Sequence, residues 1–351
     1  MSKARYSIEL SAPEASRDDV LRLGEYLPEY SVARFRKLYL DNPLGPPALC
    51  LARDESGRSV GMGAIFPTRL VVGGETVSGG IAGDFSIEPD HRGFGPALQL
   101  ERALLDASAE SLSFVYGTPN EASQQIIKRV GYHDLGRLTQ FVKLLSIEIA
   151  IAHFTRRTRL SRVVARVADP LLLLISRERR HRRPSHLAAS YPPSFDRRFA
   201  PLLESRFASG IVSGERTVES LNWKFELPSD LPGSAAYSLV AISAGHEIVA
   251  YAVSSVRNNI RHIADIGFAS EEALDALLAQ IAVDARRERI SGIAVRYFGA
   301  EGKLTAGLRS FGFIGRHDTL RLMVHADPET TFGALLLDAS HWTFLAGDMD
   351  L

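Results

Sequence analysis

Over the first 145 residues, apolar side chains repeat with two periods, one typical of strands and the other of helices. Alternating or continuous apolar runs, broken by Gly-rich turns, predict strands within 5–10, 48–66, 69–88, 112–117 and 137–145. Helical spacing predicts helices over 17–27, over 31–40 and from about residue 94 onward. One face of this last helix carries Ala97, Leu100, Leu104 and Ala107. The alternation predicts a domain of mixed α and β structure.

Residues 118–131 carry strong helix-boundary signals. Thr118 and Glu121 have the spacing of a capping box, and Pro119 stands where a first helical residue is expected. Gly131 follows the last apolar position as a C-terminal stop. The pattern predicts a helix that begins directly after Thr118.

The pattern of the first half recurs weakly in the second half, which indicates a duplicated domain. Similar pairs of segments are 35–43 with 221–229, 48–66 with 237–255, 79–89 with 260–270, and 114–132 with 294–313. The third pair aligns Asp84 with Asp265. The second copy has no Arg-x-x-Gly turn, because "FASEEALDALLAQ" stands in its place.

These patterns predict four regions along the chain: a first domain at 1–145, an arginine-rich helical linker at 146–195, a degenerate second copy at 196–328 and a C-terminal tail at 329–351. The linker contains "HFTRRTRLSRVVARVADPLLLLISRERRHRRPS", with ten arginines against two acids. We expect it to form amphipathic helices that join the domains. Its part at 156–183 could also dock on an anionic membrane surface or receive an acidic acyl carrier protein. Its aromatic residues flank the charges instead of alternating with them, so we expect no nucleic-acid binding.

Composition narrows the class of protein. The chain of 351 residues has 41 basic and 41 acidic side chains, so its net charge favours no particular partner. Cys50 is the only cysteine, which excludes an internal disulfide, and its apolar surroundings predict a core residue. Neither a signal peptide nor a metal-ligand spacing is recognised, and the longest apolar run, 170–175, is too short to span a membrane. We therefore expect a cytoplasmic protein without a metal.

The stretch "IEPDHRGFGPALQLERALL" (87–105) is the strongest candidate for chemistry. A glycine-containing turn between a strand and a helix directs backbone N–H groups and the positive end of the helix dipole into one place, which favours an anion. Arg92 can hold a phosphate oxygen, and Gly93 and Gly95 allow unusual dihedral angles and close approach of the backbone. The turn predicts a pyrophosphate site.

Residues 1–145 resemble the Gcn5-related N-acetyltransferase family, in the tandem-domain form found in bacteria with a degenerate second copy. "FSIEPDHRGFGPA" matches the strand, proline and Arg-x-x-Gly-x-Gly/Ala turn that open a helix, and "FVYGTPNEASQQIIKRVGY" matches a second signature. The resemblance implies two tandem acetyltransferase-like domains, each with a mostly antiparallel twisted sheet flanked by helices. It also implies that the fourth and fifth strands diverge at a bulge, where the pantetheine arm of acetyl-CoA or another acyl-CoA enters.

The resemblance assigns cofactor contacts to Ile87, Arg92, Gly93, Phe94, Gly95, Ala97, Asn120 and Ser123. The implied reaction is transfer of the acyl group to an amine, for which we expect a small or sugar-like molecule. Asp84, on the strand before the turn, is the candidate base or holder of the amine; alternatively it has no chemical role. Asn120 could equally serve only to start a helix.

Two positions depart from the family pattern. Pro96 lacks an N–H group that could bind the pyrophosphate. Ile127 stands where the family often has a general-acid tyrosine, and Tyr116 and Tyr132 are near in sequence but not at that place. Either another group protonates the leaving thiolate, or the chain is a non-catalytic acyl-CoA-binding or scaffold module.

Overall fold

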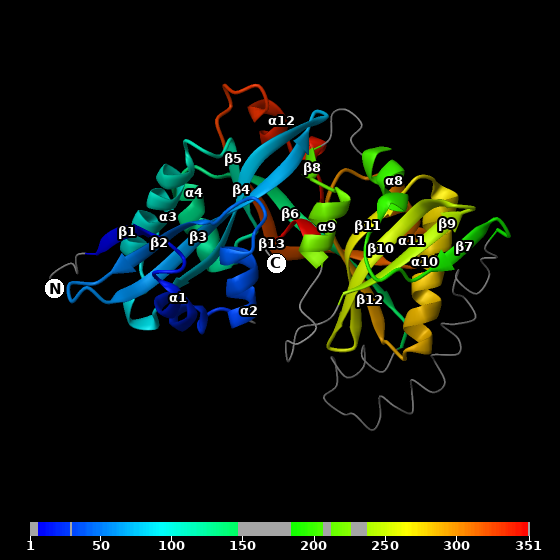
Figure 1. The fold of residues 1–351 in the computed structure, drawn as a ribbon, viewed down its shortest axis with the longest axis horizontal. Coiled ribbons are helices and arrows are strands. Elements are labelled where there is room, and N and C mark those ends of the chain that lie inside the picture. Colours follow the sequence, from blue (N-terminus) through cyan, green and yellow to red (C-terminus); the bar gives the residue numbers. More distant parts are fainter. Residues whose placement is uncertain (1–5, 29, 147–183, 206–211, 226–236, 350–351) are drawn as a thin grey trace.

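The computed structural model describes residues 6–28, 30–146, 184–205, 212–225 and 237–349. The arginine-rich segment 156–183, to which we assigned membrane or carrier-protein contacts, lies outside the described residues. Two α/β halves lie side by side and share one 14-stranded sheet (Figure 1). This is the mixed, mainly antiparallel sheet flanked by helices that the family resemblance implies.

The described strands are β1 (Ser7–Ser11), β2 (Ala48–Arg53), β3 (Ser59–Val72), β4 (Glu75–Ile87), β5 (Phe114–Gly117), β6 (His133–Leu144), β7 (Leu187–Ser190), β8 (Val212–Gly214), β9 (Ser238–Ala244), β10 (Glu247–Arg257), β11 (Ile260–Phe268), β12 (Gly292–Gly299), β13 (Ile314–Ala326) and β14 (Thr343–Leu345). The described α-helices are α1 (Arg17–Gly24), α2 (Val32–Phe35), α3 (Phe94–Ser108), α4 (Glu121–Arg129), α8 (Ala200–Glu204), α9 (Val218–Phe225), α10 (Glu271–Arg287), α11 (Lys303–Ser310) and α12 (Gly333–Leu337). A π-type turn, η1 (Arg36–Leu40), extends α2, and a 3₁₀ turn, η6 (Ala346–Asp348), follows β14.

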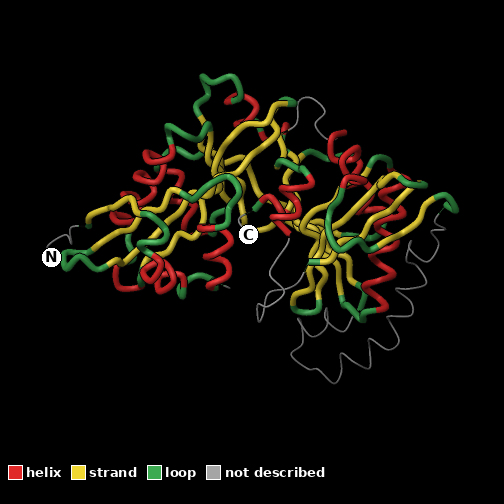
Figure 2. Tube along the Cα trace, viewed as in Figure 1, coloured by secondary structure: helices red, strands yellow, loops and turns green. Residues whose placement is uncertain are grey.

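The two halves exchange their last long strands at the centre of the sheet. The strand order is β1-β2-β3-β4-β5-β13-β6-β12-β11-β10-β9-β7, so β13 of the second half inserts beside β5 and β6 of the first half inserts beside β12. Each half repeats one parallel pair, β4 with β5 and β11 with β12. Figure 2 shows the strands continuing from one half into the other. The elements from β9 to β13 follow the same order as those from β2 to β6, and the duplication itself stays a prediction.

The period-two alternation of strand β2 separates two cores in the first half. Leu49 and Leu51 face a core formed with α1, α2 and η1. Cys50 and Ala52 face the opposite core, which α3 and α4 cover. Cys50 is therefore a core residue, as expected, and burial raises the pKa of its thiol to about 11.

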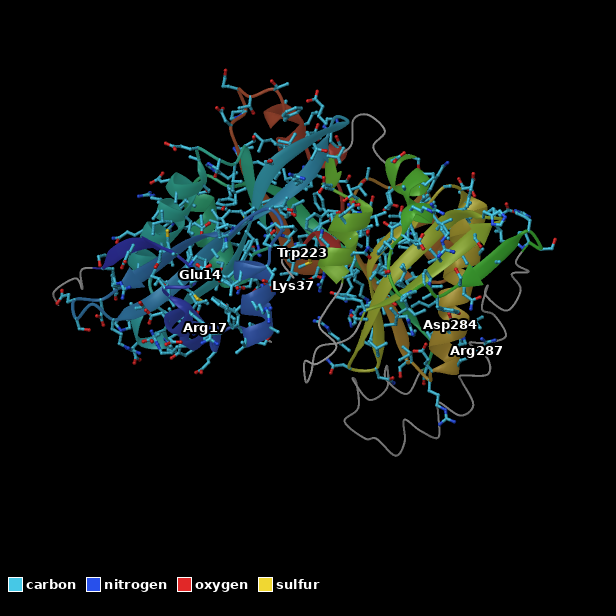
Figure 3. The ribbon with its side chains drawn as sticks, viewed as in Figure 1. Glu14, Arg17, Lys37, Trp223, Asp284 and Arg287 are labelled. Carbon is cyan, nitrogen blue, oxygen red and sulfur yellow. The ribbon has the colours of Figure 1, made fainter. Side chains whose placement is uncertain are left out.

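The halves also meet through helices and the C-terminal tail. The Lys37 ammonium lies 5.5 Å from the centre of the Trp223 ring and donates to the Lys224 carbonyl at 2.8 Å, which joins η1 to α9 (Figure 3). Trp342 and Phe344 of the tail are buried in a third core, together with residues of both halves.

The domain limits at 145, 195 and 328 stay a prediction, although β7, within the predicted linker, pairs with β9.

Two local predictions have different outcomes. The turn between β3 and β4 is formed by Gly73 and Gly74, as predicted, and their φ values of +60° and +90° explain why glycine is needed. The predicted capping box at Thr118 is wrong, because α4 begins at Glu121 and its N-cap is Asn120. The Asn120 side chain accepts a hydrogen bond from the Ser123 backbone N–H at 3.0 Å, and asparagine is among the strongest N-cap residues.

Candidate active site

Strand β4 contains a β-bulge at Asp84. Met62 of β3 lies opposite Ser86, but Ala64, two residues later, lies opposite Gly83, three residues away, so β4 has one extra residue. Asp84 has a φ of +48°, a left-handed conformation that aspartate tolerates better than most residues. The bulge bends β4 and interrupts the regular ladder of hydrogen bonds along the strand.

Beyond the bulge, β4 and β5 diverge. Their parallel pairing includes only Gly80 with Val115 and Ile81 with Tyr116. A cavity of about 170 Å³ lies between the diverging strands and the helices α3 and α4. Its polar lining includes Asp84, Glu101, Asn120 and Ser123, and its apolar lining includes Phe85 and Ile127. The structure thus has the divergence that the family resemblance implies, and three of the predicted site residues meet there.

The Asp84 carboxylate is buried, with 3% of its side chain exposed. Its Oδ1 accepts hydrogen bonds from Arg34 Nη2 at 2.8 Å and Nε at 3.2 Å, and its Oδ2 accepts one from the Tyr39 hydroxyl at 3.1 Å. Burial, together with the Asp84 charge, raises the pKa of Tyr39 and of the neighbouring Tyr30. Each carboxylate oxygen has two lone pairs, so Oδ2 retains the capacity to accept one more proton or hydrogen bond.

Within the lining of the cavity, Glu101 is the buried carboxyl group that the sequence motifs do not indicate. It lies on α3 with 2% of its surface exposed, lines the cavity and accepts a hydrogen bond from the Tyr132 hydroxyl at 3.0 Å. Burial raises the pKa of Glu101 to about 7, although the Tyr132 hydrogen bond acts in the opposite direction. An acidic residue on the apolar face that includes Leu100 and Leu104 was the signal in the sequence.

The predicted pyrophosphate turn is open at its surface. Arg92 is exposed, and its Nε donates to the Ile87 carbonyl at 3.1 Å. A Cβ atom added at Gly93 or Gly95 would meet nothing within 4 Å, so a phosphate could approach the backbone there. The expected unusual dihedral angles are wrong, because Gly93 is extended with a φ of 178° and Gly95 lies in the helix. Gly93 and Gly95 therefore leave open space at the turn, and they do not adopt an unusual backbone conformation.

The remaining residues that were predicted to contact the cofactor could do so only through some of their groups. The side chains of Ile87 and Ala97 are buried, so these residues could contact a ligand only through their backbone. Phe94 and Gly95 begin α3, where N–H groups of a first helical turn lack partners within the helix. Pro96 removes one of these donors. The turn therefore retains a helix N-terminus, two open glycine positions and Arg92, which together fit a diphosphate.

Neither Tyr116 nor Tyr132 takes the place of Ile127. The Tyr116 hydroxyl donates to the Asp348 carbonyl at 2.8 Å, toward the C-terminal tail, and Tyr132 is bound to Glu101. Both tyrosines are buried. Within the lining of the cavity, Asp84 and Glu101 are consequently the ionisable groups.

The equivalent place in the second half is filled by the chain itself. Strand β11 is paired with β12 only as far as Ile263 and Val295. Tyr297 of β12 pairs with β6 on one edge and with Leu345 of β14 on the other, so β14 lies along the edge that β11 has left. A Cβ atom on Gly347 would lie 3.0 Å from the Ala264 carbonyl, which shows that η6 packs directly on β11.

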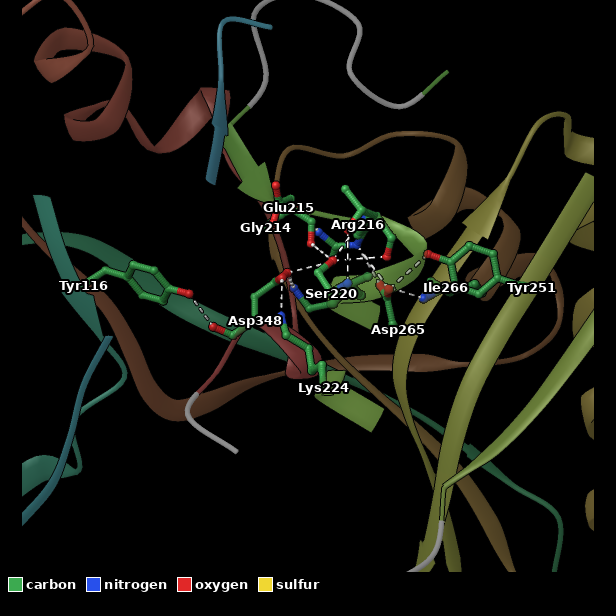
Figure 4. Close-up of polar contacts among 12 residues, drawn as sticks. Tyr116, Gly214, Glu215, Arg216, Ser220, Lys224, Tyr251, Asp265, Ile266 and Asp348 are labelled. Atoms are coloured by element: carbon green, nitrogen blue, oxygen red, sulfur yellow. Dashed lines mark hydrogen bonds and ion pairs between the residues drawn. The ribbon is translucent and has the colours of Figure 1, made fainter. Parts of the chain in front are cut away.

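A buried charge cluster anchors this tail (Figure 4). Arg216 donates to Asp348 at 2.8 Å and to Asp265 at 3.1 Å, and Tyr251 donates to Asp265 at 3.0 Å. Burial opposes ionisation of Asp348, but Arg216 and Lys224 outweigh it and lower the pKa of that carboxyl. The second half thus has a tail held by ion pairs where the first half has a cavity.

Neither a membrane span nor a metal-binding group is present among the described residues. None of the helices in this part of the chain is long and apolar enough to cross a bilayer. Within the same residues, no three His, Cys, Asp or Glu side chains are grouped closely enough to hold a metal ion.

Comparison with known proteins identifies the fold. No protein-family model and no curated protein matches the sequence. Among solved structures, a GCN5-related N-acetyltransferase from Kribbella flavida is 14% identical with a TM-score of 0.58, over 92% of this chain and 71% of that chain. One from Anabaena variabilis is 13% identical with a TM-score of 0.61, over 91% and 72%. Saccharomyces cerevisiae N-myristoyltransferase is 12% identical with a TM-score of 0.56, over 92% and 81%. The chain therefore has the fold of the GCN5-related N-acetyltransferases.

Proposed function

We propose that the chain is an acyl-CoA-dependent N-acyltransferase that acts on a small-molecule or sugar-like amine. One observation carries the proposal: Asp84 lies in the cavity where β4 and β5 diverge, in the same half as the open turn at Arg92. The likeness to acetyltransferases and an N-myristoyltransferase supports an acyl-CoA donor. The filled second half supports a single site in each chain.

The donor would lie along the free edge of β4. Beyond Ile81, the β5-facing edge of β4 has no paired strand among the described residues, so its backbone groups are available to pantetheine amides. The diphosphate would bind at Arg92 and the N-terminus of α3. A β4 backbone N–H group near the bulge would polarise the thioester carbonyl.

Transfer would then proceed by direct attack. The amine nitrogen attacks the thioester carbon, the C–S bond breaks, and CoA leaves as a thiolate that takes up a proton from water. Asp84 would accept the proton of the amine, directly or through water, while Arg34 and Tyr39 keep its carboxylate in place.

A thiol-release assay tests the proposal. Purified protein is incubated with acetyl-CoA and a panel of small amines and amino sugars, and free CoA is followed with a thiol reagent. Amine-dependent release is the expected result. Absence of release with every amine, with acyl-CoA still bound in a calorimetric titration, would favour the second candidate function.

The second candidate is a binding module that holds acyl-CoA without turnover. The specific observation in its favour is Ile127, which lines the cavity with an alkyl side chain where the family often has a proton donor. The missing N–H group of Pro96 is consistent with the same reading. Turnover that Asp84→Ala abolishes would rule this candidate out.

A further inference from the structure

Glu101 has an unusual place for a carboxyl group. It lies among the buried side chains of α3, next to Leu100 and Leu104, yet it lines the cavity. Burial of an unpaired carboxylate is costly, so such groups are retained only with a partner or as the neutral acid. Tyr132 is that partner, and this residue is itself only 4% exposed.

Glu101 lies deeper in the protein than the turn that would bind the diphosphate. It follows Phe94, the first residue of α3, by seven positions, which corresponds to about 10 Å along the helix axis. The pantetheine arm of an acyl-CoA that entered from the N-terminus of α3 would therefore pass toward Glu101 as it approached the bulge at Asp84. Both carboxyl groups line the same cavity.

Behind Glu101 the protein is packed. Cys50, Leu104, Tyr132 and Met323 belong to one core, and each is at most 4% exposed. Glu101 therefore forms a wall of the cavity on this side, with Tyr132 and the packed core behind it. An acyl chain that extended in this direction would have to displace Glu101 or Tyr132.

We propose that Glu101, held by Tyr132, is a specificity-determining residue that limits the donor to short acyl groups. This inference rests on the proposed function, because it concerns the same site. A long chain would have to pack its methylene groups against a polar carboxyl group and separate it from its tyrosine partner, which carries a desolvation penalty. The neutral form that burial favours does not remove that penalty, because a carboxylic acid still has to be hydrogen-bonded.

The test compares chain-length profiles of the wild type and three variants. Affinities for acetyl-, butyryl-, octanoyl- and myristoyl-CoA are measured by calorimetry, and turnover is measured by thiol release. Glu101→Ala shortens the wall, Glu101→Gln keeps its shape and polarity, and Asp106→Ala removes an exposed acid from the same helix as a matched control. Circular dichroism and thermal melts confirm that each variant is folded.

The wild type is expected to favour acetyl-CoA over octanoyl-CoA by at least about tenfold, since even one methylene group is commonly discriminated to that extent. Glu101→Ala is expected to shift this ratio toward octanoyl-CoA by about tenfold or more. Glu101→Gln and Asp106→Ala are expected to retain the wild-type order of donors.

Three results would overturn the inference. The first is equal binding of acetyl- and octanoyl-CoA by the wild type. The second is an unchanged chain-length profile in a folded Glu101→Ala variant. In both cases CoA still binds, so the proposed function survives. The third is absence of binding of any CoA thioester, which removes the proposed function and this inference together.

Discussion

Asp84 of β4 and Asp265 of β11 each lie at or next to a β-bulge, and each carboxylate accepts hydrogen bonds from an arginine and a tyrosine. Their surroundings differ in one respect. Asp84 lines a cavity, whereas Asp265 shares Arg216 with Asp348 of the C-terminal tail. Each half therefore has a buried carboxylate of this kind, and the C-terminal tail packs next to the one in the second half.

We expect Asp84→Asn to lower kcat by about 10²–10⁴-fold, because an amide cannot accept the amine proton. The affinity for acetyl-CoA should be nearly unchanged, since the donor contacts the turn at Arg92 and the edge of β4. Thiol-release kinetics and calorimetry on the same samples measure the two quantities. Tyr39→Phe is the matched control: it removes one hydrogen bond to Asp84 but no proton acceptor, and it should have a much smaller effect. Equal loss in both variants would contradict a role for Asp84 as the base.

Arg92→Ala and Gly95→Asp should weaken acyl-CoA binding. A charge-assisted hydrogen bond to phosphate contributes about 1.5–3 kcal/mol, so we expect a loss of affinity of about tenfold to a hundredfold for Arg92→Ala. Gly95→Asp places a negative side chain in the open space of the turn and should have a larger effect. Arg102→Ala, an exposed arginine of the same helix, is the control for general charge loss. Unchanged affinity in both turn variants would remove the assignment of the diphosphate site.

Local structure was largely predictable from the sequence. The strands from β2 to β6, the glycine turn before β4 and the long helix α3 follow from alternation, turn residues and helical spacing. The start of α4 was misplaced because Thr118 and Asn120 both suit an N-cap, and Pro119 fits either choice. The exchange of β6 and β13 could not be predicted, since contacts between distant strands, not local pattern, decide which edges pair.

The candidate site was predictable only where residues follow one another closely. Asp84 and the turn at Arg92 lie on one strand–turn–helix unit, so one motif indicates both. Arg34 reaches Asp84 from 50 residues away, and such partners carry no sequence signal of their own. Glu101 does carry a signal, since it is a lone acid on an apolar helix face.

The buried charge cluster should make Asp348 more important for stability than its place near the C-terminus suggests. Asp348→Ala leaves Arg216, which is 4% exposed, with one carboxylate fewer in a buried site. Removing one partner of a buried ion pair commonly costs about 3–5 kcal/mol, and we expect a loss of that size in urea unfolding. The exposed pair of Arg309 and Glu301 supplies the control, because Glu301→Ala should leave the unfolding midpoint nearly unchanged. Similar midpoints for the two variants would show that the tail is not held by its charges.

Glu101 should make the protein less stable as pH rises through the neutral range. Its pKa is about 7 in the folded chain against an ordinary value of 4.5, so between these values the folded state holds a proton that the unfolded state has released. Stability from this group is therefore complete below about pH 4.5 and is lost by about pH 7, with a total change of about 3 kcal/mol. Glu101→Gln keeps the hydrogen bond to Tyr132 but cannot ionise.

The difference in unfolding free energy between wild type and Glu101→Gln, measured in urea from pH 4.5 to pH 8, should consequently shift in favour of the variant by that amount. Glu110→Gln, an exposed acid beyond the end of α3, should track the wild type at every pH. A constant difference between wild type and Glu101→Gln across this range would show that Glu101 is ionised in the folded protein throughout, and that the cavity wall is charged.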